Sequence, residues 1–509
     1  MNTAALRTLI IYGVILPLAV FVGWIISGDL TRTSFASLAA IVFVLLLPVL
    51  LKWHYEALIL SWSSGITIFF LPGNPSLWML MAGINVGIAL FSRIIQKRQA
   101  FLSAPSLSLP LLALLAVVLI TAGIHGGIGL RSLGSSVVGG RYYYYLIAGV
   151  LSYFAFASQI IPLDHVQTVL RMLFLPALLN AVSTVIYYAG PAFYFLYLVF
   201  PVAAAGVQAA AEQSGALVRF VGFSSAANFV ALYVMARYGI RGILQKWWRV
   251  LFLIVLLVVS MLGGYRSTLI LLILVLMALF VLEGLLRSPI FPALLLIGTL
   301  GLVALFPLAG KLPGSIQRSI SFIPGLRIDS AIRMDAEGST NWRLEIWKTL
   351  LPDLPKYVWL GKGYSLDPTD IYLTQQAVLR GRAADFEGSL LTGDYHSGPL
   401  SVYVPFGSFG FLAFVTFLIT SLRGTYRNYI YGREELRTVN RFVFALFLVK
   451  IFFFLFVFGA FANDLSQFAG LAGLSVALNR GICTKPATNP RPVVFRGALS
   501  AGNTEPGLA

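Results

Sequence analysis

The run Asp394-Tyr395-His396-Ser397-Gly398-Pro399 closes the one long polar stretch of this sequence, which begins at Lys311. The stretch from Lys311 to Ser397 holds 10 of the chain's 19 acidic residues and 10 of its 36 basic residues, so it is neutral. On both sides of it, short connections separate apolar runs of roughly 20 residues, the length that a helix needs to cross a bilayer core. One segment is therefore suited to water, and the remainder is suited to lipid.

The composition of the chain indicates its class. Hydrophobic residues make up 58% of the sequence and charged residues only 11%, whereas about a quarter of the residues of soluble domains are charged. A transmembrane barrel would show alternating segments of about 10 residues, and these apolar runs do not alternate. We therefore predict an all-α polytopic membrane protein with about 12–14 transmembrane helices and one large loop domain.

The apolar runs predict where the individual helices cross the membrane, with boundaries good to a few residues. The predicted spans lie at about 6–26, 34–51, 57–72, 77–92, 105–124, 142–160, 166–188, 224–240, 249–263, 267–286, 289–309, 398–421, 442–462 and 466–479.

The segment Pro191 to Ala210 is also apolar enough to span, but a span there would reverse the topology of everything that follows. An interfacial or re-entrant segment is preferred, and whether it spans stays open.

The positive charge of the chain follows this pattern of spans. Outside Lys311 to Ser397 the chain carries 26 basic and 9 acidic residues, which accounts for the net charge of +17. These Lys and Arg residues gather in short connections, as the positive-inside rule requires of cytoplasmic loops. The charge therefore indicates membrane topology rather than nucleic-acid binding. Both termini are predicted to be cytoplasmic and the polar stretch to lie outside. Cys483 is the only cysteine of the sequence, so no intrachain disulfide can form and the outer stretch must hold together without one.

Four parts result from this organisation. Residues 1–309 form the N-terminal transmembrane helices, residues 310–397 form the large outer loop, residues 398–480 form the C-terminal transmembrane helices, and residues 481–509 form a disordered cytoplasmic tail.

Three polar residues are predicted to converge on the outer face: Arg219, Arg266 in the turn Gly263-Gly264-Tyr265-Arg266-Ser267, and His396. An arginine beside paired glycines can present its planar fork to phosphate oxygens while the backbone approaches closely. A histidine can take a proton from an acceptor hydroxyl. Simpler interpretations stay open, because Arg266 could snorkel to the interface, His396 could cap the next helix and Arg219 could be a loop charge.

Further polar residues are secondary candidates. Arg343 and Trp347, four residues apart, could share a helix face and stack on each other or on substrate. Lys450 lies inside an apolar span, where an ionisable residue suggests a function, although snorkelling explains it equally well. Arg141 stands before a run of tyrosines that fits either an interfacial belt or sugar stacking. The sequence contains no His and Cys cluster with metal-ligand spacing.

Several of these stretches, in this order, resemble the bacterial O-antigen ligase and O-antigen polymerase superfamily. The resemblance covers roughly residues 200 to 420 and rests on an Arg-x-x-x-Trp helix, a Gly-x-Gly turn, a histidine followed by a polar residue and a glycine-marked membrane helix; the stretches are 341–347, 360–364, 395–397 and 404–411. Arg219 with Gly222 and Asn228 is similar to the family's upstream arginine motif, and the turn at Arg266 to its short arginine turn. The sequence departs from the family at Ser397, where Asn is usual, and before Asn228, where Asn-Pro-Asn is common.

The resemblance implies a glycosyltransferase of the GT-C type that needs no metal or other cofactor and works at the periplasmic face of the bacterial inner membrane. It would pass a glycan from an undecaprenyl-pyrophosphate carrier to an acceptor hydroxyl. Arg219 and Arg266 would hold the pyrophosphate, and His396 would activate the acceptor. Arg343, Tyr395, Tyr364, Arg141 and Asn228 would bind substrate.

A polysaccharide transporter or flippase with an extracytoplasmic cap is the alternative. Coupling acids near the midplane would support transport, but Asp and Glu are almost absent from the predicted spans. The choice between ligase and polymerase, the acceptor, the sugar, the linkage and the oligomeric state all stay open.

Overall fold

The computed structural model describes Tyr12 and residues 16–27, 32–69, 71–96, 104–129, 139–213, 217–384 and 386–485. These residues form helices and connections without a β-strand, apart from one isolated bridge between Thr67 and Ser76. Within the described ranges, six helical segments are long and apolar enough to cross a membrane: Leu77–Ile94, Pro105–His125, Leu163–Ala189, Ile290–Lys311, Gly398–Tyr431 and Glu434–Phe456. The prediction of an all-α polytopic membrane protein is confirmed, whereas the number of spans and the GT-C type stay predictions.

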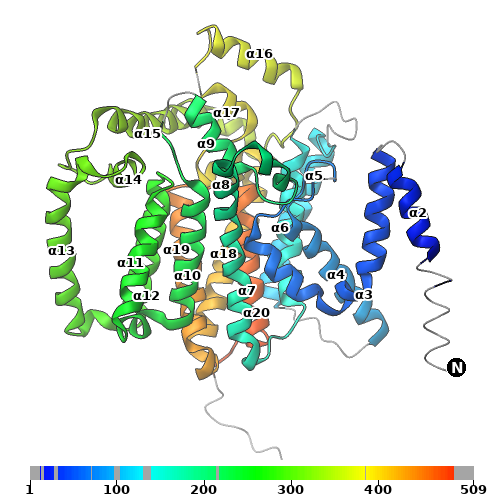
Figure 1. The fold of residues 1–509 in the computed structure, drawn as a ribbon, viewed down its shortest axis with the longest axis horizontal. Coiled ribbons are helices and arrows are strands. Elements are labelled where there is room, and N and C mark those ends of the chain that lie inside the picture. Colours follow the sequence, from blue (N-terminus) through cyan, green and yellow to red (C-terminus); the bar gives the residue numbers. More distant parts are fainter. Residues whose placement is uncertain are drawn as a thin grey trace, which may run out of the picture.

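The helices stand side by side in a bundle (Figure 1). The first part comprises α2 (Leu16–Ser27), α3 (Arg32–Ser64), α4 (Leu77–Gln96), α5 (Pro105–His125), α6 (Gly140–Ala157), α7 (Val166–Phe174) and α8 (Leu179–Ala189). The second comprises α10 (Val221–Leu244), α11 (Trp247–Met261), α12 (Arg266–Leu282) and α13 (Ile290–Leu308). The chain then forms the loop segment, residues 311–397, and returns through α18 (Gly398–Tyr431), α19 (Arg437–Phe456) and α20 (Phe461–Asn479).

Two buried clusters hold the bundle together. One joins apolar side chains of α7, α10, α12 and α19, and the other joins those of α5, α6, α18 and α20. Small residues bring α6 and α20 close, because a Cβ at Gly473 would lie 2.7 Å from the Tyr153 carbonyl oxygen and one at Gly149 would lie 3.2 Å from Leu465. Close backbone approach of this kind is how helices associate where lipid offers no hydrophobic driving force.

One predicted boundary is wrong. The predicted gap between the spans 34–51 and 57–72 coincides with a kink at Trp53 inside α3, but this helix ends at Ser64 rather than at 72. Residues 191–210 do not form one continuous helix; they divide into the 3-10 helix η5 (Pro191–Leu198) and the start of α9 (Ala203–Gln213). The η5 segment begins with Pro191 directly after Gly190, whose φ of 96° ends α8. Whether residues 191–210 span the membrane stays open.

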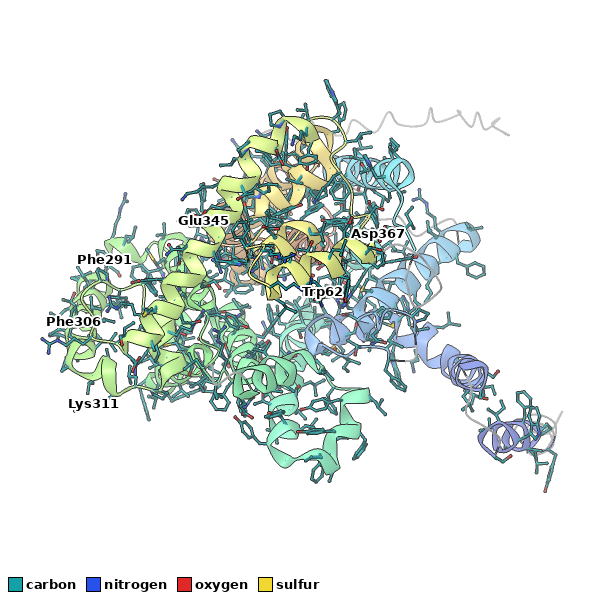
Figure 2. All side chains as sticks on the ribbon, turned by 90° about the horizontal axis from the view of Figure 1, so that it is seen from above. Trp62, Phe291, Phe306, Lys311, Glu345 and Asp367 are labelled. Carbon is teal, nitrogen blue, oxygen red and sulfur yellow. The ribbon has the colours of Figure 1, made fainter. Side chains whose placement is uncertain are left out.

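The loop segment covers one end of the bundle, which we call the loop end. It contains α14 (Gly314–Ile320), α15 (Ser330–Leu350), the 3-10 helix η8 (Leu351–Tyr357), α16 (Pro368–Leu379) and α17 (Glu387–Thr392). Asp329 starts α15 by accepting hydrogen bonds from the backbone N–H groups of Ala331 and Ile332. In the view from above, Glu345 of α15 and Asp367 lie over the bundle, whereas Phe291, Phe306 and Lys311 lie at its edge (Figure 2).

The loop segment also forms backbone hydrogen bonds with α18, at a break in that helix. This helix breaks at Gly407, whose φ is 62°. At the break, the backbone N–H groups of Lys362 and Gly363 donate to the carbonyl oxygens of Val404 and Pro405 over 2.9 and 3.0 Å, and Ser408 N–H donates to Val358 over 2.7 Å. The backbone groups freed by the kink are thus satisfied by the loop, which fixes the loop segment to the membrane helices.

The opposite end of the bundle is fixed by a buried acid. Glu283, at the end of α12, accepts hydrogen bonds from the backbone N–H groups of Ile240 and Arg241, both 2.8 Å long, where α10 breaks at Gly239. The side chain of Arg441 lies 3.5 Å from the same carboxylate. Glu283 therefore joins α10, α12 and α19.

Three helix ends lie near the predicted boundaries between the four parts of the chain. α13 ends at Leu308, α18 begins at Gly398, and α20 ends at Asn479. The predicted tail lies outside the described residues from position 486 onward. The division into parts stays a prediction.

Candidate functional site

A tight turn at the loop end carries Arg266. Gly263 and Gly264 join α11 to α12, and Gly264 has a φ of 68°, which a residue with a Cβ adopts only with strain. A Cβ at Gly263 would lie 2.6 Å from the Ser224 hydroxyl, so the turn packs directly on α10. The paired glycines therefore let the backbone reach α10 and place Arg266 at the first position of α12.

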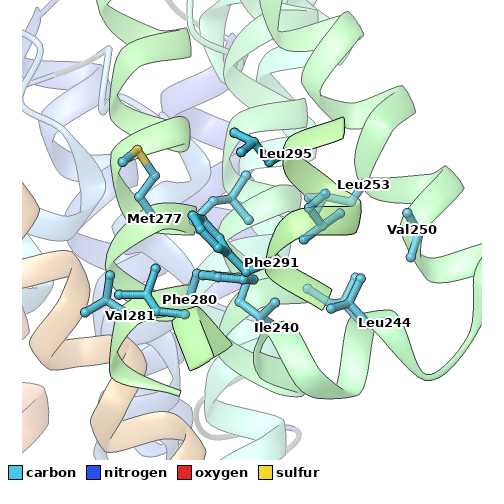
Figure 3. A pocket seen from close by; sticks show the side chains of 13 residues that line it. Ile240, Leu244, Val250, Leu253, Met277, Phe280, Val281, Phe291 and Leu295 are labelled. Atoms are coloured by element: carbon cyan, nitrogen blue, oxygen red, sulfur yellow. The ribbon is translucent and has the colours of Figure 1, made fainter. Parts of the chain in front are cut away.

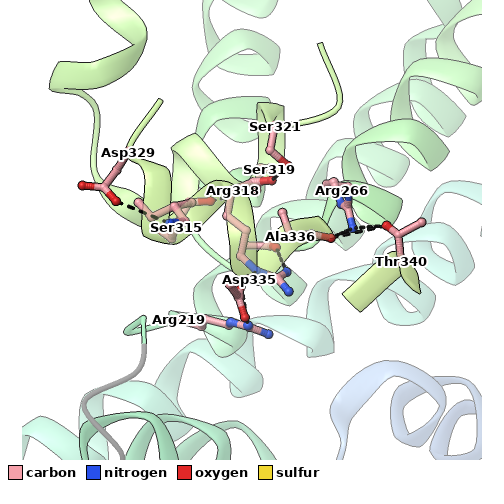
Figure 4. Close-up of polar contacts among 12 residues, drawn as sticks. Arg219, Arg266, Ser315, Arg318, Ser319, Ser321, Asp329, Asp335, Ala336 and Thr340 are labelled. Atoms are coloured by element: carbon pink, nitrogen blue, oxygen red, sulfur yellow. Dashed lines mark hydrogen bonds and ion pairs between the residues drawn. The ribbon is translucent and has the colours of Figure 1, made fainter. Parts of the chain in front are cut away.

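Two further arginines meet at Asp335 of α15 (Figure 4). Arg318, on α14, donates from Nε to Asp335 Oδ2 and from Nη1 to the Gly264 carbonyl oxygen over 2.7 Å. Arg219 Nη2 lies 3.7 Å from the same carboxylate oxygen. Arg318 is only 6% exposed, so it both fixes the glycine turn and holds the carboxylate.

Arg266 also contacts α15, at the residue after Asp335 and one turn further on. Its Nη2 donates to the Ala336 carbonyl oxygen over 2.8 Å and to Thr340 Oγ1 over 3.1 Å. Asp335 and Ala336 are neighbours on α15, so Arg219 and Arg266 both contact the same part of this helix.

His396, which lies just before α18, packs against α15 further along that helix. Its ring meets Trp342 of α15 edge-on at 4.9 Å between centroids and Phe458 at 5.3 Å. Nδ1 lies 3.1 Å from Asp394 Oδ1 and 3.3 Å from the Asp394 carbonyl oxygen. Nε2 makes no hydrogen bond with the part of the chain that the structure describes.

The backbone of His396 is strained. Its φ is 50°, in the left-handed region that non-glycine residues rarely adopt. The surrounding contacts hold this conformation, since Trp347 Nε1 donates to the carbonyl oxygen of the preceding Tyr395 over 2.9 Å. Strain of this kind is concentrated at functional sites.

Arg343 interacts both with the arginines around Asp335 and with Asp394 beside His396. Burial lowers its pKa, the positive charges of Arg266 and Arg318 lower it further, and Asp394 opposes them. Its guanidinium lies 5.7 Å from the centroid of Phe458, the ring that also contacts His396, and its Nε is buried without a hydrogen bond. Four guanidinium groups therefore face two carboxylates, and the excess positive charge favours an anion.

Residues 250–415 match the sequence model of the O-antigen ligase family. This segment belongs to that family. The match confirms the resemblance to O-antigen ligases and polymerases, and it supports a ligase-type or polymerase-type transfer of glycans by a multi-pass membrane protein. No curated protein matches the chain.

The O-antigen ligase segment contains most of the site. Arg266, Arg318, Asp335, Arg343 and His396 lie within it, and Arg219 lies upstream. Among the residues that the structure describes, no group of three His, Cys, Asp or Glu side chains could hold a metal ion.

Two residues predicted to bind substrate, Tyr364 and Tyr395, belong to buried clusters. Tyr395 is fully buried and packs with Ile346 and Leu350 of α15. Tyr364 is 6% exposed and packs on Tyr143 and Phe406. Burial raises the pKa of both phenols. Their side chains support the loop rather than open toward the arginines.

Two other predicted binding residues, Arg141 and Asn228, lie on α6 and α10. Arg141 Nη2 donates to the Tyr145 hydroxyl over 2.7 Å, and its guanidinium lies 5.1 Å from that ring. Tyr145 and Asn228 both line a cavity of about 450 Å³ that also contains Phe458. We call this the polar cavity.

Sequence reasoning missed Arg318, Asp335 and Asp394. Arg318 and Asp335 lie in a stretch with equal numbers of acids and bases, so no local pattern distinguishes them. Asp394 stands two residues before His396, and that spacing is the signal that could have revealed it.

Proposed function

We propose that this protein is a glycosyltransferase of the bacterial inner membrane. It transfers a glycan from an undecaprenyl-pyrophosphate carrier to an acceptor hydroxyl at the periplasmic face. The observation that carries the proposal is that α15 brings Arg219, Arg266 and Arg343 together with His396 at the loop end of the bundle. The clustered arginines can stabilise a departing pyrophosphate, and the histidine beside them can remove the proton of an acceptor hydroxyl.

The arginines stabilise the leaving group. During transfer, the bond between the anomeric carbon and the pyrophosphate oxygen breaks, and its electron pair stays on the pyrophosphate. Guanidinium groups fixed before the reaction stabilise this charge without reorganising. Because they supply the positive charge, the reaction needs no metal. Asp335 occupies Arg219 and Arg318 in this structure, and the pyrophosphate takes its place on Arg219.

His396 accepts the proton of the acceptor hydroxyl at Nε2. The acceptor oxygen then forms the new bond to the anomeric carbon from the face opposite the pyrophosphate, so the configuration at that carbon is inverted. Asp394, beside Nδ1, stabilises the imidazolium that forms. The proton leaves His396 after the product departs.

Release of undecaprenyl pyrophosphate from lipid-linked glycan by the purified protein tests the proposal. His396→Ala and Arg266→Ala should each lower the rate at least 100-fold, since each removes a group that acts in the transition state. Glycan transfer to the acceptor is measured in the same samples.

Matched controls are His165→Ala and Arg171→Ala, exposed residues of the opposite end whose described contacts are local. Both should keep wild-type activity. Full activity in a folded His396→Ala variant would remove its role as the base. Absence of release with every acceptor tried would favour transport of the glycan.

A further inference from the structure

The polar cavity lies directly beside the candidate site. Ser267 and Thr268, which follow Arg266, line it on α12. Phe458 lines it at the α19–α20 connection and contacts both His396 and Arg343. A ligand whose charged end lies on the arginines can therefore extend into this cavity. Its volume of about 450 Å³ is within the range of roughly 300–1,000 Å³ typical of ligand pockets.

The lining of this cavity is unusual for a membrane bundle. Asn228, Lys450, Asn463, Asp464 and Gln467 all contribute to it. A second cavity, of about 400 Å³ and bounded by α10 to α13, is lined by apolar side chains alone, among them Met277, Phe280 and Phe291 (Figure 3). Polar and ionisable side chains are costly at membrane depth, so their concentration in one cavity indicates a polar ligand.

The polar groups offer both donors and acceptors. The Lys450 ammonium donates to Gln467 Oε1, and Asp464 Oδ2 accepts the Ala460 N–H over 2.8 Å. Asn228 Oδ1 is buried without a hydrogen-bond partner. Buried polar atoms are nearly always paired, so an unpaired amide oxygen on a cavity-lining residue is a candidate acceptor for a ligand donor.

Aromatic rings supply the rest of the wall. Trp62 and Trp78 both line the cavity and meet edge-on at 5.0 Å between centroids. Mixed donors and acceptors beside aromatic faces suit a sugar ring, because its hydroxyl groups both donate and accept while its C–H face is apolar. The Asp464 carboxylate disfavours a second pyrophosphate site here, and the charged groups disfavour an acyl chain.

We infer that the polar cavity binds the sugar joined directly to the pyrophosphate of the donor, and that Asn228 and Gln467 are among the residues that select it. The inference rests on the proposed function. It separates two tasks: the arginines bind the carrier, and the cavity recognises the glycan.

Equilibrium binding by the full-length protein in nanodiscs tests this division. The ligands are bare undecaprenyl pyrophosphate and a panel of the same carrier bearing one hexose, one N-acetylhexosamine or one uronic acid. Wild type should bind at least one sugar-bearing carrier roughly tenfold more tightly than the bare carrier, as expected for a few added hydrogen bonds. Asn228→Ala and Gln467→Ala should bring this ratio toward one without changing the Kd of the bare carrier.

Asn85→Ala is the matched control, because the Asn85 amide oxygen is also buried without a partner but lies outside the cavity. It should keep the wild-type ratio. An unchanged ratio in folded Asn228→Ala and Gln467→Ala overturns the inference and leaves the proposed function intact. Equal weakening of bare and sugar-bearing carriers overturns it too, because the cavity would then hold the carrier. If wild type binds none of the ligands and releases no carrier, the proposed function fails and the inference fails with it.

Discussion

His396 combines a strained backbone with a ring that is fixed on three sides. A left-handed conformation costs a non-glycine residue about 1–2 kcal/mol, and the contacts of Trp342, Phe458 and Asp394 maintain it. The ring is therefore oriented before any substrate arrives, with Nε2 as the nitrogen left for chemistry. Preorganisation of this kind is more useful for catalysis than for a helix cap.

Asp394 is expected to position His396 and to stabilise its charged form. Asp394→Asn keeps the shape but removes the negative charge 3.1 Å from Nδ1. We expect kcat for glycan transfer to fall roughly tenfold, which corresponds to about 1.4 kcal/mol of lost stabilisation, with little change in KM. Steady-state kinetics of carrier release measure both values.

Two comparisons separate this role from a structural one. Asp394→Glu keeps the charge and should recover part of kcat, whereas Asp367→Asn, an exposed change at the start of α16, should leave kcat unchanged. A rise in KM with constant kcat in Asp394→Asn would show that Asp394 acts in binding instead.

Single residues were predictable where the sequence marks them locally. Paired glycines beside Arg266 and the membrane boundary before Gly398 identified two of the main candidates. Arg318 depends on a contact with the Gly264 carbonyl oxygen, 54 positions away, and no local pattern encodes such a pairing. Tyr364 and Tyr395 stand in the expected motifs, yet their apolar rings pack into the loop because burial of an aromatic surface stabilises more than exposure of its hydroxyl.

At the scale of elements, the broken helix α18 determines where the loop segment lies. A Cβ at Gly407 would lie 2.2 Å from the Trp359 carbonyl oxygen, and one at Gly361 would lie 2.3 Å from the Pro405 carbonyl carbon. Only glycines allow the loop and the kinked helix to exchange hydrogen bonds at this distance. The loop thereby holds α15 over the bundle.

Gly407→Ala should destabilise the protein strongly. The substitution combines the cost of a positive φ with a backbone overlap, for a total of roughly 3 kcal/mol. Thermal unfolding in detergent should show a lower Tm, and carrier release should fall because α15 is displaced. Gly388→Ala is the control, since Gly388 lies in the helix α17 with no atom within 4 Å of a Cβ placed there. A Tm of Gly407→Ala equal to that of Gly388→Ala would contradict this account.

The helices themselves follow from apolar runs, but their ends depend on context. The predicted spans 249–263 and 289–309 differ from α11 and α13 by at most two residues at each end. The predicted span 398–421 is shorter than α18, which continues to Tyr431 because Ser421, Thr425 and Asn428 are buried against neighbouring elements. Hydropathy recognises lipid-facing surface and cannot recognise a polar face that packs on protein.

For the whole molecule, the charge pattern divides the bundle into two ends. The neutral loop segment covers one end, and the opposite end carries Arg237, Arg241, Arg433, Arg437 and Arg441 at the ends of α10, α18 and α19. The excess of arginine at that end favours the cytoplasm, which would place the loop end in the periplasm.

Cysteine labelling in intact cells measures this orientation. In a Cys483→Ser background, Leu379→Cys on α16 should react with a membrane-impermeant maleimide, whereas Glu434→Cys should react only after the membrane is opened. Both positions are exposed, at 79% for Leu379 and 88% for the Glu434 side chain. The reverse pattern of labelling would invert the proposed topology and move the arginine site to the cytoplasm.

The helix α13 stands apart from the centre of the bundle. None of the residues of α13 is buried, and the helix lies at the edge of the molecule, held near its ends by Phe291 on Phe280 and by Phe306 near Gly325 (Figure 1). Its length and apolar composition suit it to face lipid, and a fluid solvent imposes no particular shape on the side chains that it contacts. Leucine, isoleucine, valine and phenylalanine should therefore replace one another along α13 in related proteins, with little more than its length and hydrophobicity conserved. Relatives of this protein should be hardest to align at this helix, although it is among the easiest to recognise by hydropathy.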